Sequence, residues 1–305
     1  MSMFFERTSS HWVKYSEYEY RHGKDGVLYL TPKPKAKPLV YGPLKDGETM
    51  VLDALNVGRM AMKEHSDKGM TKQLKQTVMD FVTKYGLLGF MTALPTTAQF
   101  MDYQAVYLPK NHFLKEETMP TNDYVDLFFP FSKPDFYKDE RTAQWHVAND
   151  KEMMALSMTF VDASMAMSMS LQREYAERFD WLVSQFTDWA FSFVSAFLYY
   201  QDYEILDENT RQLYRDGISA FGGIAPTYRI ALLDKPTIVW DFHSLLLGIQ
   251  MMFSFMLTDE AKPIRYCKQC TMLFLTKHPN AEFCSPKCKN QHNVEKSVKK
   301  SKGKK

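Results

Sequence analysis

Cysteine is absent from the first 266 residues of this 305-residue chain, and all four cysteines fall within the next 22 positions. No N-terminal segment combines a basic start, an apolar run and a small-residue cleavage site, which a secreted disulfide-rich protein would need. We therefore expect a cytoplasmic protein whose clustered thiols bind a metal ion.

Long hydrophobic runs are also missing. The two most apolar stretches, residues 186–200 and 242–257, are too short for a comfortable bilayer span, and polar residues such as Asp188 and His243 interrupt them. Both stretches predict buried helices, and we expect no membrane partner.

Familiar catalytic motifs are lacking as well. The chain has no His-Glu-x-x-His, no Gly-x-Ser-x-Gly, and no glycine-rich phosphate loop that ends in lysine and serine or threonine. We therefore expect a protein that is not an enzyme, although the role and any small-molecule ligand of residues 1–260 stay open.

Charge is unevenly distributed, although the net charge is only +2. From Lys262 onward twelve Lys or Arg residues stand against two Glu residues, whereas the first 261 residues carry a net charge of about −8. This asymmetry indicates a C-terminal module that binds anions, appended to a body with other partners.

The body, residues 1–260, contains enough apolar residues for a sizeable core, with 45% hydrophobic and 14% aromatic residues in the whole chain. Its patterns predict a mainly α fold with peripheral β-hairpins, of the α+β class. Hairpins are expected at 12–31 and 228–240, and irregular structure with short strands at 95–134. Helices are expected at 74–85, 150–203 with a break near 171–176, 207–221 and 241–257.

The segment 264–298 predicts a small zinc finger. Cys267 and Cys270 form a Cys-x-x-Cys pair, and Cys284 and Cys288 supply the second pair of thiolates needed for a tetrahedral structural site. Ser285 is a good N-cap, and the following proline suits the first helical position, so Cys288 should lie in the first turn of a helix. A knuckle, a hairpin and a helix give a treble-clef-like outline around one structural Zn²⁺.

The finger resembles the CGNR-type zinc fingers of bacterial proteins over residues 264–298. The resemblance is carried by the two cysteine pairs, by Leu273-Phe274, by Phe283-Cys284-Ser285 and by the last ligand, where the family's Cys-Gly-Asn-Arg reads Cys-Lys-Asn-Gln. In that family the finger usually ends a longer, mostly helical chain. The resemblance implies a DNA-binding transcription regulator.

Basic and amide side chains follow the last ligand. Lysines can neutralise phosphates, and Asn or Gln can read base edges if the finger helix enters a groove. The candidate contacts are Lys287, Lys289, Asn290, Gln291, Asn293, Lys296, Lys299 and Lys300. Residues 299–305 are expected to be a basic disordered tail, and duplex DNA is the expected partner.

A second interpretation stays open, in which the protein is an interaction or scaffold protein and the finger is purely structural. The two interpretations differ in whether Lys287, Lys289 and Lys296 lie on one exposed face or the finger helix docks on the body. The sequence leaves homo-oligomerisation open.

Overall fold

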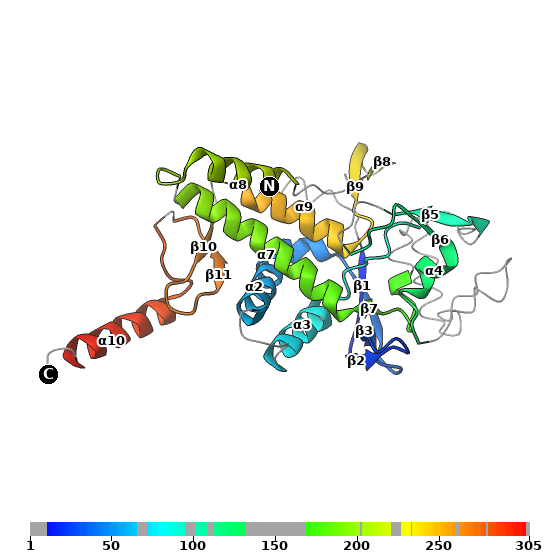
Figure 1. The fold of residues 1–305 in the computed structure, drawn as a ribbon, viewed down its shortest axis with the longest axis horizontal. Coiled ribbons are helices and arrows are strands. Elements are labelled where there is room, and N and C mark those ends of the chain that lie inside the picture. The colour runs from blue at the N-terminus through cyan, green and yellow to red at the C-terminus, as the bar shows by residue number, and fades with distance from the viewer. Residues whose placement is uncertain are drawn as a thin grey trace.

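The computed structural model describes residues 11–65, 72–94, 102–108, 113–131, 169–201, 203–220, 227–232, 234–259, 263–278 and 280–302. About 48% of the described residues are helical, with small antiparallel sheets around the helices, which confirms the predicted α+β class (Figure 1). The predicted helix at 150–168 and part of the segment 95–134 lie outside the described residues.

Helices α2 (Gly47–His65) and α7 (Phe179–Gln201) pack against each other at the centre of the body. Their backbones approach so closely that a Cβ atom at Gly58 would lie 1.8 Å from the carbonyl oxygen of Phe186 and 2.8 Å from the Cβ of Ala190. Only glycine fits at this crossing, which sets the spacing of the two helices.

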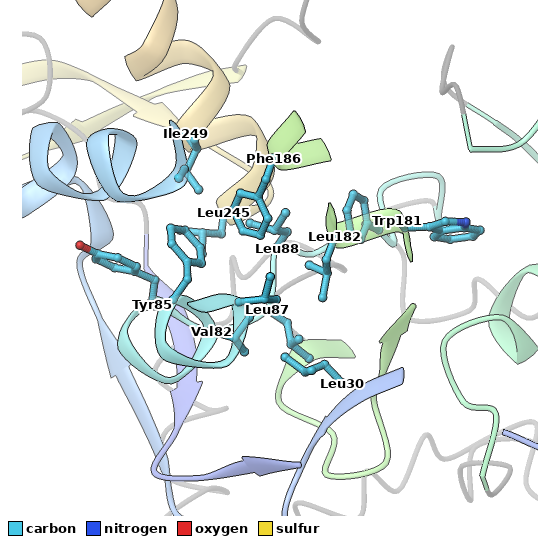
Figure 2. Packing of buried hydrophobic residues seen from close by; sticks show 14 of the residues in the cluster. Leu30, Val82, Tyr85, Leu87, Leu88, Trp181, Leu182, Phe186, Leu245 and Ile249 are labelled. Carbon is cyan, nitrogen blue, oxygen red and sulfur yellow. The ribbon is translucent and has the colours of Figure 1, made fainter. Parts of the chain in front are cut away.

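Helix α3 (Lys72–Tyr85) lies beside α2 and buries one stripe of its side chains, as predicted. It ends at Gly86, whose φ of +94° is the left-handed conformation expected of a glycine C-cap. Figure 2 shows how Leu88, in the loop after α3, packs with Phe186 of α7 and Leu245. The core therefore joins segments far apart in the sequence.

A buried carboxylate organises the loop after α3. Glu177 accepts hydrogen bonds from the backbone N–H groups of Leu88 (2.9 Å), Gly89 (2.6 Å) and Phe90 (3.0 Å), and from the hydroxyl of Tyr175 (2.8 Å). Burial raises the pKa of Glu177, while these donors act against that shift. The four donors compensate for removing the carboxyl group from water.

The N-terminal strands form two small sheets against the helices. The predicted hairpin is β2 (Tyr18–His22) with β3 (Leu28–Pro32), and β7 (Glu177–Arg178) adds a third strand to it. Strand β1 (Trp12–Tyr15) pairs instead with β4 (Pro38–Tyr41). The short helix η1 (Pro43–Asp46) then leads into α2.

Peripheral elements complete the body. The short strands predicted within 95–134 are β5 (Ala105–Tyr107) and β6 (Thr118–Pro120), which pair with each other. The short helix α4 (Thr121–Asp126) in the same region was not predicted. Helix α8 (Glu208–Ala220), the hairpin β8 (Thr227–Leu232) and β9 (Pro236–Asp241), and helix α9 (Leu245–Leu257) all confirm predictions. Ser244 caps α9 by accepting the backbone N–H of Leu247.

The C-terminal segment contains β10 (Ile264–Tyr266), β11 (Leu273–Leu275) and helix α10 (Pro286–Lys302). The two strands lie beside α7 and α2, whereas α10 projects away from the body (Figure 1). Helix α10 continues to Lys302, so residues 299–302 are helical rather than part of a disordered tail. Among the described residues, no helix is long and apolar enough to cross a membrane.

Candidate metal centre

The first cysteine pair lies in a tight turn between β10 and β11. The N–H of Cys267 donates to the carbonyl of Met272 (3.0 Å), and the N–H of Thr271 donates back to the carbonyl of Cys267 (2.9 Å). These bonds close the turn and bring the side chains of Cys267 and Cys270 to the same side. The Cys-x-x-Cys knuckle is therefore held by its own backbone.

The second pair is positioned by the start of α10. The hydroxyl of Ser285 accepts the backbone N–H of Cys288 at 3.3 Å, and α10 begins at Pro286, so the predicted N-cap and first helical residue are confirmed. Cys288 lies in the first turn of the helix. Cys284 lies two residues before the helix.

The four sulfur atoms gather at one point, all within 4.8 Å of one another. The Sγ atom of Cys284 lies 3.7 Å from that of Cys270 and 3.5 Å from that of Cys288, far beyond the length of a disulfide bond. A tetrahedral zinc ion with Zn–S bonds of about 2.3 Å would separate its sulfur ligands by about 3.8 Å. The cysteines therefore fit one tetrahedral metal ion.

The thiols perturb one another strongly. Desolvation and hydrogen bonds with the neighbouring thiols raise the pKa of Cys284 to about 12. Desolvation also raises the pKa of Cys267. Hydrogen bonds from backbone N–H groups to its sulfur outweigh this effect and lower the pKa of Cys267 to about 6. A divalent cation that binds the four sulfurs would therefore displace the proton that the raised pKa of Cys284 retains.

The finger hairpin docks on the body through Tyr266, whose side chain is half-buried. Its ring centroid lies 5.6 Å from that of Phe193 and 5.4 Å from that of Phe197, both on α7. The guanidinium of Arg59, on α2, lies 4.4 Å from the same ring centroid. Tyr266 therefore contacts both central helices of the body.

Two polar side chains of α2 bind the backbone of the knuckle itself. Arg59 donates a hydrogen bond to the carbonyl of Thr271, and the N–H of Leu273 donates to Oδ1 of Asn56 at 3.0 Å. Thr271 has a φ of 59°, and it is the one non-glycine residue with a positive φ in the described part of the chain. The body thus contacts the finger at the point where its backbone is most constrained.

Helix α10 carries the candidate nucleic-acid contacts on its exposed surface. Lys287, Lys289, Asn290, Gln291, Asn293 and Lys296 are all exposed, whereas the side chains of Lys299 and Lys300 lie outside the described residues. At 3.6 residues per turn, Lys289, Asn293 and Lys296 share one face, and Lys287 lies on the opposite side. The three lysines are therefore exposed but do not form a single face.

Hydrogen bonds link this helix to the knuckle. Glu295 accepts from the side-chain amides of Gln269 (2.9 Å) and Gln291 (3.1 Å), so Gln291 is engaged within the finger. Lys268, also in the knuckle, forms an ion pair with Glu282. These contacts, together with the cysteines, fix where α10 begins relative to the body.

Sequence reasoning found the four cysteines but missed Asn56 and Arg59. Both lie on a helix more than 200 residues away, and no local pattern distinguishes them from other polar residues on a helix. The unusual backbone conformation of Thr271, which accepts the hydrogen bond of Arg59, becomes visible only in the structure. The docking of a finger on a body is a tertiary property.

Three comparisons were made with this chain. No family model, no curated protein and no solved structure matches it.

Proposed function

We propose that the four cysteines hold one structural zinc ion in a treble-clef-like finger. A tetrahedral set of four thiolates is typical of structural zinc sites. The knuckle between β10 and β11, the helix that follows it, and the sulfur separations of 3.5 and 3.7 Å support the proposal. The resemblance to the CGNR-type fingers supports it as well. Two histidines of the same segment, His278 and His292, could replace a missing cysteine as ligands, but the cluster consists of the four cysteines without them.

We propose further that α10 is a nucleic-acid-binding helix and that the protein acts on duplex DNA as a transcription regulator. The observation that carries this proposal is that α10 projects from the body with six lysines and one glutamate along its 17 residues (Figure 1). Such a helix can lie against phosphates or in a groove without moving the body. Most of its contacts would be independent of base sequence.

The docked hairpin favours a second candidate function, that of a scaffold in which zinc only stabilises the finger. Tyr266 packs against Phe193 and Phe197, and Arg59 binds the backbone of the knuckle, so the finger stabilises the surface of the body. This arrangement and DNA binding are compatible, because docking uses the hairpin and leaves α10 exposed. The two candidates differ only in what α10 contacts.

The experiment is the binding of the full-length, zinc-loaded protein to a mixed-sequence DNA duplex over a salt series. Lys289 and Lys296 share one face of α10, and we expect the double variant Lys289→Glu/Lys296→Glu to lose most of the affinity and to flatten the salt dependence by about one unit per lost phosphate contact. Fluorescence anisotropy measures both quantities.

The matched control reverses two exposed lysines of the body, Lys35→Glu/Lys115→Glu, and changes the net charge equally. We expect it to weaken binding only slightly. Unchanged affinity in the α10 variant, or equal losses in both variants, would contradict the DNA proposal and leave the scaffold function.

A further inference from the structure

The hairpin β8–β9 has one face made only of apolar side chains. Residues directly opposite in an antiparallel pair lie on the same face of the sheet. The face consists of three cross-strand pairs: Tyr228 with Trp240, Ile230 with Ile238, and Leu232 with Pro236. The charged residues of the turn, Asp234 and Lys235, lie at the tip of the hairpin and outside this face.

This apolar face is largely exposed. The side chains of Tyr228, Ile230, Leu232 and Ile238 are 64%, 69%, 82% and 51% exposed. In an ordinary hairpin at a protein surface, the apolar face packs on the core and the polar face meets water. Here the apolar face meets water instead.

The body covers only the base of the hairpin. Trp240 is half-buried against the core, and its ring contacts that of Tyr228 in an edge arrangement with centroids 5.8 Å apart. Beyond this anchor the hairpin stands out from the body beside α9 (Figure 1). A two-stranded hairpin is marginally stable in water, so an exposed apolar face of this kind requires a cover.

We propose that this cover is the same face of a second copy of the chain, in a homodimer with twofold symmetry. In a twofold-symmetric dimer, a surface contacts the same surface of the second copy, so charged residues on it would bring like charges together. The face carries no charged side chain, so two copies of it bring no like charges together within the contact. A nucleic acid or another charged partner would find no complementary charge on this face.

The centre of the face identifies the residues on which the dimer depends. Ile230 and Ile238 form the middle pair of the register, with the Tyr228 pair on one side and the Leu232 pair on the other. Side chains at the centre of an interface lose most contact with water and contribute most to affinity. The inference is independent of DNA binding, because the hairpin and α10 are separate elements.

The test is the molar mass of the full-length, zinc-loaded protein over a concentration series from about 1 to 100 µM, measured by sedimentation velocity and light scattering. We expect the wild-type protein to reach twice the chain mass of 35.6 kDa. The variant Ile230→Glu should weaken the dimer at least about tenfold, since it buries a charge at the centre of the interface.

The control variant Leu213→Glu makes the same change on α8, at a side chain of similar exposure (73%) outside the hairpin, and should dimerise like the wild type. Circular dichroism shows whether each variant is folded, and Ile230→Thr, which suits a strand, provides a milder substitution that should also weaken the dimer.

Three results would overturn the proposal. The first is a wild-type protein that stays at the mass of a single chain throughout the series. The second is a folded Ile230→Glu variant that dimerises as tightly as the Leu213→Glu control. The third is a monomeric wild-type protein that floats with neutral phosphatidylcholine vesicles, which would assign the face to a lipid surface.

Discussion

Thr271 combines two features that oppose each other. Its backbone adopts the left-handed conformation that glycine tolerates best, and its side chain is branched at Cβ. The turn that closes the knuckle imposes this conformation, because the N–H of Thr271 bonds to the carbonyl of Cys267 and its own carbonyl accepts from Arg59. The strain is thus held in place from both the finger and the body.

Replacing this residue by glycine should relieve the strain. Thr271→Gly keeps both backbone hydrogen bonds, and we expect it to raise the free energy of unfolding by about 1 kcal/mol, the usual cost of a left-handed residue. Thr118→Gly, an exposed strand position, is the control and should lower stability by about 0.5–1 kcal/mol. Chemical denaturation measures both changes, and a destabilised Thr271→Gly would show that the threonine side chain stabilises the knuckle.

At the scale of elements, the crossing of α2 and α7 depends on one missing side chain. Gly58→Ala would place a methyl group 1.8 Å from a carbonyl oxygen of α7, so the helices must separate. We expect a loss of about 1–3 kcal/mol or more in the free energy of unfolding, as for other overpacked cores.

The control for this substitution is Gly217 of α8, where an added Cβ meets nothing within 4 Å. Gly217→Ala should stabilise the protein by about 0.5–1 kcal/mol through helix propensity. Opposite signs at the two glycines, measured by urea denaturation, are expected. A neutral Gly58→Ala would mean that the helices are packed less closely than the structure indicates.

The elements that sequence reasoning predicted are those with a local signal. The stripe of Leu74, Val78 and Phe81 predicted α3, and Ser285 with Pro286 predicted the start of α10. The pairing of β1 with β4 and the addition of β7 to β3 were missed, because pairing between distant strands depends on tertiary packing. The helical course of residues 299–302 was missed because a lysine-rich end also suits a disordered chain.

The candidate site was predictable to a similar extent. Cysteine spacing alone specified all four thiols that the structure brings within 4.8 Å. Their position on the body was not predictable, since it depends on the contacts of Tyr266 with aromatic side chains of α7 and with Arg59 of α2. The two residues between the cysteines of a Cys-x-x-Cys pair are a local signal that sequence shows directly. The position at which the finger docks depends on the surface of the folded body, which sequence does not show.

At the scale of the molecule, docking should couple metal binding to the stability of the body. An ion that binds only the folded finger stabilises whatever the folded finger contacts. We therefore expect chelation, or the variant Cys284→Ser, to lower the unfolding temperature of the body as well as to unfold the finger. Near-ultraviolet circular dichroism during a thermal scan follows the aromatic core of the body.

The double variant Asn56→Ala/Arg59→Ala removes the polar link between the body and the knuckle, and it should reduce the effect of chelation on the body. If chelation shifts the unfolding of the wild type and of this variant equally, the link contributes nothing to the coupling. If chelation leaves the wild-type body unaffected, the finger and the body are independent folding units.

The proposed finger depends on one zinc ion that is bound by four thiolates. X-ray absorption at the zinc edge of the purified full-length protein measures the number, type and distance of the ligands directly. We expect one zinc ion per chain with four sulfur ligands at about 2.3 Å. A protein without zinc, or nitrogen and oxygen atoms among the ligands, would contradict it.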